Sequence, residues 1–272
     1  MPILTANGAR IAYTDTGPPP ARPDAPTVIF GHGLLFSGWM FHHQVQALRE
    51  RYRCVTVDWR GQGDTPATPD GYDMDTLTAD AVGVIRALGV APVHWVGLSM
   101  GGFVGMRLAA RHGEVLRSLA LLDTSAGPED PDKISRYRLL ALAYRLVGIR
   151  PIRGQVEPIM FGPTLRADPA GRAVIDEWAT RLSRCDRAGM RRAILGVCDR
   201  APIEGELDAI TVPTLVAVGD DDVATPPAKA RRIVEAIPDA TLSGIPHSGH
   251  SCAIEQPDTV TTLLGDFLDR HS

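Results

Sequence analysis

The 272-residue sequence predicts an α/β fold in which a mostly parallel central sheet is flanked by helices. Short apolar runs repeatedly end in Gly or Asp and are followed by amphipathic helical patterns, which is typical of parallel strands joined by crossover helices. From about residue 127 to residue 207 this alternation stops, and only helical patterns remain. We therefore expect a core domain formed by residues 1–126 and 208–272, with residues 127–207 inserted as a helical cap.

The apolar runs locate the expected strands along the chain. Residues 10–14 fit an antiparallel edge strand, and the Pro-rich segment 17–26 fits a surface loop. Parallel strands are expected, in chain order, at residues 27–30, 54–57, 93–96, 119–122, 214–218 and 240–242. Apolar residues on one helical face predict helices near residues 77–88, 137–147, 174–182 and 260–268.

Composition and charge argue against several classes of protein. A formal net charge of -4 and a pI near 6.1 do not suit a nucleic-acid-binding surface. The N-terminal residues lack the basic and long apolar regions of a signal peptide, and no apolar run approaches the roughly 18 residues of a spanning helix. We expect a cytoplasmic protein with neither a membrane nor a nucleic acid as its partner. Nothing in the sequence indicates an oligomeric state.

The sequence also lacks the common signatures of metal and cofactor sites. Cys54, Cys185, Cys198 and Cys252 are scattered, with no C-x-x-C spacing and no paired His motif for zinc. There is no Walker A motif and no Rossmann fingerprint. We therefore expect reduced, packed cysteines, no metal site and no organic cofactor.

Residues 97–101 read Gly-Leu-Ser-Met-Gly and fit the G-x-S-x-G nucleophile elbow. They fall between the apolar strand 93–96 and a helical pattern at 103–110, which is the context that the motif requires. In an elbow, a sharp strand-to-helix turn exposes the serine hydroxyl, and small flanking residues let neighbouring backbones approach closely. Ser99 is therefore the candidate nucleophile.

A nucleophilic serine needs a histidine to accept its proton and a carboxylate to orient that histidine. In the elbow architecture the acid and then the histidine follow the serine along the chain. His250 lies between the last apolar strand and the C-terminal helix, so it can return over the carboxyl edge of the sheet; His247 is its competitor. The residues leave four candidates for the acid: Asp220, Asp221, Asp222 and Asp123.

Attack on a carbonyl also requires donors for the developing oxyanion. These donors are usually the backbone N–H of the residue after the nucleophile and one from a loop after an earlier strand. Here they correspond to Met100 and to Leu34, in the segment Gly31-His32-Gly33-Leu34-Leu35. The two glycines of that segment permit a tight turn beneath the site.

Five segments in order make the chain resemble the α/β-hydrolase superfamily. They are Gly31-His32-Gly33-Leu34, Asp58-Trp59-Arg60-Gly61-Gln62-Gly63, the elbow through Gly102, Gly219-Asp220-Asp221-Asp222-Val223-Ala224-Thr225-Pro226, and Gly249-His250 with Glu255-Gln256-Pro257. The resemblance spans nearly the whole chain apart from the insertion. After Gly63 the family usually has a serine, whereas this chain has Asp64-Thr65, so we interpret that segment as a structural brace.

The resemblance implies an α/β-hydrolase fold with Ser99, Asp222 and His250 as the catalytic triad and with Leu34 and Met100 as the oxyanion donors. The serine argues against the haloalkane dehalogenases and epoxide hydrolases, which use an aspartate nucleophile. The chain looks most like small bacterial carboxylesterases and lactonases, including oxoadipate enol-lactonases and acyl-homoserine lactonases. We therefore expect a serine hydrolase of a small carboxylic ester or lactone.

Aromatic and apolar residues at the insertion are candidates for a substrate pocket. We expect contributions from Leu35, Tyr144, Met160, Phe161 and Trp178, and also from Leu140, although packing within the cap would produce the same pattern. Three alternative functions remain open on this fold. They are acyl transfer to another acceptor, including peroxide, by a cofactor-free perhydrolase; carbon–carbon bond hydrolysis; and ligand binding without turnover.

Overall fold

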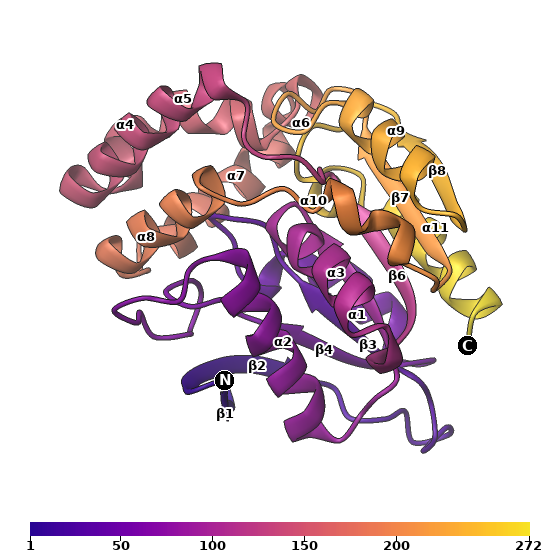
Figure 1. Cartoon of the computed structure of the whole chain (residues 1–272). Coiled ribbons are helices and arrows are strands. Elements are labelled where there is room, and N and C mark those ends of the chain that lie inside the picture. Colours follow the sequence, from indigo (N-terminus) through magenta and orange to yellow (C-terminus); the bar gives the residue numbers. More distant parts are fainter.

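The computed structural model describes residues 1–272, and at its centre is an eight-stranded sheet in the order β1-β2-β4-β3-β5-β6-β7-β8 (Figure 1). The strands are β1 (Ile3–Ala6), β2 (Ala9–Asp15), β3 (Thr27–Gly31), β4 (Arg53–Val57), β5 (Val93–Leu98), β6 (Leu116–Leu122), β7 (Thr214–Gly219) and β8 (Ala240–Ile245). Strands β3 to β8 pair in parallel, whereas β1 and β2 are antiparallel. The predicted mostly parallel sheet is confirmed.

The expected strand at residues 10–14 lies within β2, but it is not the edge of the sheet. Strand β1 pairs with it, with Leu4 opposite Ile11 and Ala6 opposite Ala9. The sequence analysis missed β1 because only Ala6 of its four residues is buried, so an apolar periodicity is absent.

Eleven α-helices accompany the sheet. They are α1 (His42–Leu48), α2 (Met74–Leu88), α3 (Met100–Arg111), α4 (Pro131–Val147), α5 (Ile149–Met160), α6 (Pro163–Ala167), α7 (Pro169–Leu182), α8 (Arg187–Cys198), α9 (Pro227–Ala236), α10 (Cys252–Glu255) and α11 (Pro257–Arg270). None of these helices is both long and apolar enough to cross a membrane.

Helices cover both faces of the sheet because strand side chains alternate between the faces. In β3, Val28 and Phe30 pack with residues of α1 and α11, whereas Ile29 packs on the opposite face with α2, α3 and α9. All three side chains are fully buried. This two-sided burial explains why the central strands are continuous apolar runs in the sequence.

Helix α2 illustrates how local signals define an element. Asp73 caps its N-terminus by accepting the N–H of Thr76 at 2.8 Å, and Gly89 ends the helix with a left-handed φ of 64°. Leu77 and Ile85 lie on the buried face of the helix. The expected helix at residues 77–88 is therefore correct but begins one turn earlier.

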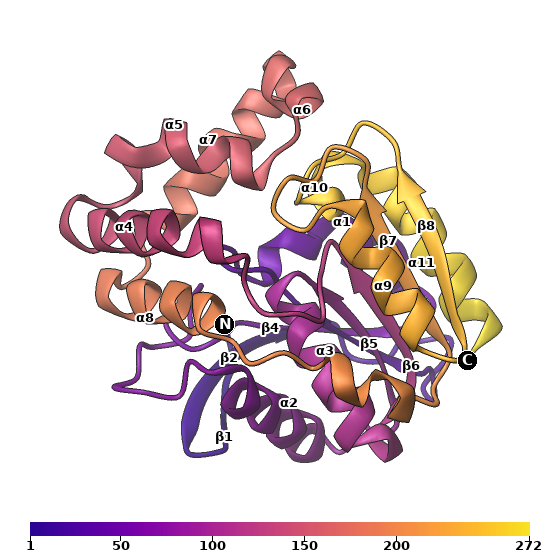
Figure 2. The same cartoon turned by 45° about the horizontal axis from the view of Figure 1, so that its top comes forward.

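Helices α4 to α8 lie over one edge of the sheet (Figures 1 and 2), and α4 packs against α8. These helices share a single apolar cluster with the face of the sheet that carries α1 and α11. That residues 127–207 form a separable cap domain stays a prediction. Their position matters for function because they stand above the carboxyl ends of the parallel strands, where open α/β sheets bind ligands.

Candidate active site

Ser99 lies in a sharp turn between strand β5 and helix α3. Its backbone has φ 51° and ψ -109°, a conformation that non-glycine residues rarely adopt. Two glycines make the turn possible. A Cβ at Gly97 would lie 2.8 Å from the nitrogen of Gly102, and a Cβ at Gly101 would lie 2.5 Å from the carbonyl carbon of Gly31. Any side chain at either position would therefore push the backbones apart.

Two further side chains form a hydrogen-bonded chain with Ser99. His250, on the loop between β8 and α10, has its Nε2 atom 2.9 Å from Ser99 Oγ. Its Nδ1 atom lies 2.9 Å from Oδ2 of Asp222, which follows strand β7. All three residues are buried. When Nδ1–H donates to the carboxylate, the neutral imidazole presents Nε2 as an acceptor to the serine hydroxyl.

The carboxylate of Asp222 is held in place by its own turn. Oδ1 accepts the backbone N–H groups of Ala224 at 2.8 Å and Thr225 at 3.0 Å. The Thr225 hydroxyl donates to Oδ2 at 2.8 Å, and its oxygen also lies 3.3 Å from His250 Nδ1. The sequence analysis assigned Thr225 no role of its own. Its position three residues after an aspartate, in a turn, is the signal that could have identified it.

The competing residues make no hydrogen bond to Ser99 or His250. Asp220 is exposed and Asp221 is half-buried, and neither hydrogen-bonds to the imidazole. His247 is exposed, and its carbonyl accepts from Gln256 Nε2 at 3.2 Å. The alternatives that the sequence left open are therefore separated by geometry.

Asp123 has a different environment from that of Asp222. Its carboxylate accepts the N–H of Gly219 at 2.9 Å and the N–H of Cys252 at 3.0 Å. Asp123 thus joins the end of β7 to the start of α10. The loop that carries Asp222 begins after β7, and the loop that carries His250 ends at α10. Burial and the charge of Asp222 raise the pKa of Asp123 to about 7.

Burial and pairing act in opposite directions on His250 and Asp222. Burial by itself would lower the pKa of His250, but the adjacent Asp222 carboxylate outweighs it, so that the pKa of the imidazole is raised above 6.5. Burial would raise the pKa of Asp222, but the imidazole and the Thr225 hydrogen bonds lower it below 3.8. Asp222 therefore carries a negative charge against the imidazole at neutral pH.

The loop after β3 lies directly beside Ser99. A Cβ at Gly33 would lie 3.5 Å from Ser99 Cβ, and the next residue, Leu34, lines the same cavity as Ser99. The N–H of Leu34 makes no hydrogen bond within the protein. Helix α3 begins at Met100, and the first N–H groups of a helix have no partner within it. Leu34 and Met100 therefore flank Ser99 with backbone donors available to a ligand.

The segment at residues 58–63 supports this loop without contacting Ser99. Asp58 accepts the N–H of Gly38 at 2.7 Å, and Gln62 Oε1 accepts the N–H of Leu35 at 2.9 Å. The second contact holds Leu35 in a left-handed conformation with φ 68°. These hydrogen bonds agree with the interpretation of the segment as a brace.

Glu255 joins the cap to the His250 loop. Its Oε2 atom accepts the N–H of Gly162 at 2.7 Å and that of Gly249 at 3.0 Å, and Oε1 accepts the N–H of Ser251 at 3.0 Å. Burial raises the pKa of Glu255 despite these three donors. One carboxylate thereby holds the backbone on both sides of His250. The sequence assigned Glu255 no role, because periodicity carries no signal for a side chain whose partners are backbone groups.

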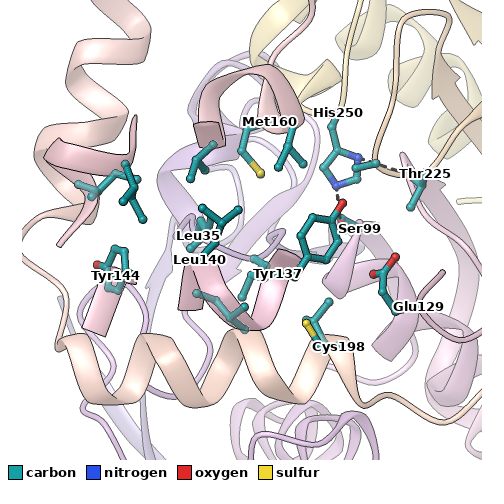
Figure 3. A pocket seen from close by; sticks show the side chains of 18 of the residues that line it. Leu35, Ser99, Glu129, Tyr137, Leu140, Tyr144, Met160, Cys198, Thr225 and His250 are labelled. Atoms are coloured by element: carbon teal, nitrogen blue, oxygen red, sulfur yellow. Dashed lines mark hydrogen bonds between the residues drawn. The ribbon is translucent and has the colours of Figure 1, made fainter. Parts of the chain in front are cut away.

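A cavity of about 810 Å³, including its open mouth, begins at Ser99 and His250 and extends beneath the cap. Fifteen of its nineteen lining residues are hydrophobic. The structure places Leu35, Tyr144 and Met160 in its wall, as well as Leu140 (Figure 3). Its mostly apolar wall with a few polar groups is typical of small-molecule sites.

Phe161 and Trp178, which were expected in the pocket, are not part of its wall. Their rings meet edge to face with centroids 5.2 Å apart, and both pack on Phe36. The Trp178 indole donates to the carbonyl of Leu35 at 3.0 Å. These aromatic rings fix the cap to the loop after β3, which is the packing role that the sequence could not distinguish from pocket lining.

Sequence analysis also missed polar residues of the cavity wall. Tyr137 and Glu129 both line it, and Glu129 is paired with Arg200 at 2.9 Å. Tyr137 lies on the same face of α4 as Leu140 and Tyr144, so its helical spacing could have identified it.

The four cysteines are free, and no group of three or more His, Cys, Asp or Glu side chains is arranged to hold a metal ion.

Comparisons with known proteins agree with the fold. Residues 28–263 match the model of the alpha/beta hydrolase family. The chain is 31% identical to a Variovorax paradoxus protein with the provisional name carbamate hydrolase RutD, over 92% of this chain and 94% of that protein. It superposes with a TM-score of 0.90 on a thermophilic esterase from Thermogutta terrifontis, at 27% identity and 100% coverage of both chains. An enol-lactonase from Burkholderia xenovorans also gives a TM-score of 0.90, at 28% identity, covering 98% of this chain and 100% of that one.

Proposed function

This chain belongs to the alpha/beta hydrolase family, and we propose that it is a serine hydrolase that cleaves a small carboxylic ester or lactone. The observation that most directly supports the proposal is the hydrogen-bonded chain from Ser99 through His250 to Asp222 at the mouth of an apolar cavity. The esterase and the enol-lactonase among the similar structures support the choice of ester and lactone substrates.

In the first step of the proposed mechanism, Ser99 Oγ attacks the substrate carbonyl carbon while its proton passes to His250 Nε2. The 2.9 Å separation of these atoms is within the range needed for proton transfer. Asp222 keeps the receiving nitrogen unprotonated and then stabilises the imidazolium that forms. Because the Asp222 carboxylate is buried, water screens its attraction to the imidazolium only weakly.

The negative charge that develops on the carbonyl oxygen is bound in this mechanism by the N–H groups of Leu34 and Met100. His250 then donates its proton to the departing alcohol oxygen, which leaves an acyl group on Ser99. Water, deprotonated by the same imidazole, attacks the acyl-enzyme and releases the acid. No step requires a cofactor.

The proposal is tested by intact-protein mass spectrometry after treatment with a fluorophosphonate, followed by peptide mapping. We expect one adduct, on Ser99, and its loss in Ser99→Ala. The same substitution should reduce hydrolysis of p-nitrophenyl acetate by at least ~10³-fold, as in other triads that lose their nucleophile. Ser135→Ala, at an exposed serine of α4, is the matched control and should retain both labelling and turnover.

Two outcomes would count against the proposal. Substantial turnover by folded Ser99→Ala would assign the nucleophile elsewhere. Labelling of Ser99 without turnover of any ester or lactone would favour ligand binding over hydrolysis.

A further inference from the structure

Building on the proposed function, we infer that the substrate carries a neutral, apolar acyl chain of medium length. The chain occupies the part of the cavity beneath helices α4, α5 and α8, and the leaving alcohol lies at the rim beside His250. Three features of the cavity carry this inference: the chemistry of its wall, its length and its charge.

The wall changes character with distance from Ser99. In Figure 3, Ser99, His250 and Glu129 lie at one end, Tyr144 lies at the other, and Leu140 lies between them. The cap helices contribute mainly aliphatic and thioether side chains to the wall, together with the ring of Tyr144: Leu140, Tyr144, Ile149, Ile152, Val156, Ile159, Met160, Ile194 and Val197. The Tyr144 hydroxyl is already bonded to the carbonyl of Leu182 at 2.9 Å. This arm of the cavity therefore offers a substrate only apolar side-chain surface.

Helix α4 provides a scale for the length of the arm. Tyr137 and Tyr144 are seven residues apart on its inner face, which corresponds to ~10 Å at the rise of an α-helix. An extended chain advances about 1.2 Å per bond. A chain of about eight carbons therefore spans the distance between these two wall residues, whereas an acetyl group would not.

The charges at the cavity disfavour an acyl chain that ends in a carboxylate. Glu129 is the charged side chain in the wall, and its partner Arg200 is fully engaged. Arg200 pairs with Glu129 at 2.9 Å, donates to the Gly127 carbonyl at 3.1 Å and to Ser125 Oγ at 3.3 Å, and stacks on Phe103 at 4.4 Å. A carboxylate at the far end of the chain would find no Lys or Arg in the cavity wall, and burying an unpaired charge is costly.

We assign the apolar arm of the cavity to the acyl group because the leaving alcohol must lie next to His250, at the other end. The alcohol oxygen has to come within hydrogen-bonding reach of His250 Nε2 to receive its proton. Thr225, whose hydroxyl oxygen lies 3.3 Å from His250 Nδ1, and its neighbour Ala224 form part of the wall next to His250. The adjacent Val223 is 56% exposed, so this side of the cavity borders on solvent. An alcohol can depart there, while the enclosed arm retains the acyl chain.

The first test compares two series of esters on the full chain. With p-nitrophenyl esters from acetate to palmitate, we expect kcat/KM to rise at least ~100-fold from acetate to octanoate and to fall for longer chains, because each buried methylene contributes about fourfold. With acetates of alcohols of increasing length, the change should stay below about tenfold. The p-nitrophenyl monoester of suberate, which adds a terminal carboxylate to an octanoyl-length chain, should react at least ~100-fold more slowly than the octanoate ester.

Two variants of the arm should shift the optimum in opposite directions. Ile194→Phe narrows the arm from α8 and should move the preferred chain toward butyrate. Ile152→Ala enlarges it from α5 and should move the preference toward decanoate. Leu139→Phe, on the outer face of α4 at 66% exposure, is the matched control and should leave the profile unchanged. Because the second variant removes atoms, it remains informative if the first fails to fold.

The outcomes separate this inference from the proposed function. If Ser99 labels and acetate esters turn over but the acyl profile is flat, the acyl arm is refuted while the hydrolase stands. If kcat/KM instead depended on the length of the alcohol in the acetate series, the arm would bind the alcohol, and the inference would be overturned. The inference would also be overturned if neither Ile194→Phe nor Ile152→Ala changed the preferred acyl-chain length. Absence of labelling and of acetate turnover would reject the proposed function itself.

Discussion

Replacing Gly101 with alanine tests whether the close approach of α3 to β3 determines the position of Ser99. A Cβ at residue 101 would lie 2.5 Å from the carbonyl carbon of Gly31 and 3.1 Å from its Cα, and both neighbours are backbone atoms. Ordinary contacts begin at 3.4 Å, so the strand and helix must separate by about 1 Å. Overpacking that side chains can relieve costs ~1–3 kcal/mol, and backbone atoms cannot rotate away, so we expect at least ~3 kcal/mol of destabilisation.

The same displacement should reduce activity beyond its effect on stability. It separates the start of α3, which carries Ser99 and Met100, from the loop after β3, which carries Leu34. A misplacement of about 1 Å in an active site costs on the order of 100-fold in rate. We therefore expect kcat/KM for p-nitrophenyl esters to fall by about this factor under conditions where the variant is still folded.

The assay combines urea denaturation with ester hydrolysis and fluorophosphonate labelling rates. Gly154→Ala is the matched control, because a Cβ there meets nothing within 4 Å and the residue is exposed within helix α5. Alanine should stabilise that helix by ~0.5–1 kcal/mol and leave activity unchanged. If Gly101→Ala had the same urea-denaturation midpoint and the same rate of ester hydrolysis as the parent, the argument that backbone contact positions Ser99 would be refuted.

Two further predictions concern charges. Only the neutral imidazole of His250 accepts a proton, and the pKa of this imidazole is raised. We therefore expect kcat/KM to fall as the pH decreases, with a midpoint above 6.5. Asp222→Asn should lower that midpoint, and an unchanged pH profile would contradict the assignment of the acid. Asp80→Asn should destabilise the fold by ~3 kcal/mol in urea, because it leaves Arg60, paired at 2.7 Å and 7% exposed, without its counter-charge. Glu177→Gln, which breaks an exposed pair, should cost no more than ~0.5 kcal/mol, and equal effects of the two would argue against the role of burial.

Features with local causes were predictable from the sequence. The turn at Ser99 depends on a strand, two glycines and a helix within about twenty residues, and all of these leave a local pattern. The central strands were found because both of their faces are buried, so their apolar runs are continuous. Strand β1 was missed because little of it is buried.

The histidine and the acid show where local pattern becomes insufficient. The residues alone left Asp123 and three adjacent aspartates as candidates, and only the resemblance to a known family singled out Asp222. In the structure, Asp123 bonds to the N–H groups of Gly219 and Cys252, whereas Asp222 faces His250. That difference depends on which loops meet at the sheet edge.

The sequence by itself therefore determined the α/β architecture, the elbow at Ser99 and the set of residues from which its partners are drawn. Only the tertiary structure decided that Phe161 and Trp178 pack together instead of lining the cavity, that Glu255 binds the backbone around His250, and that Arg200 neutralises Glu129. The physical reason is that periodicity reports which face of an element is apolar. It does not report which distant element covers that face, or which backbone groups a buried charge will meet.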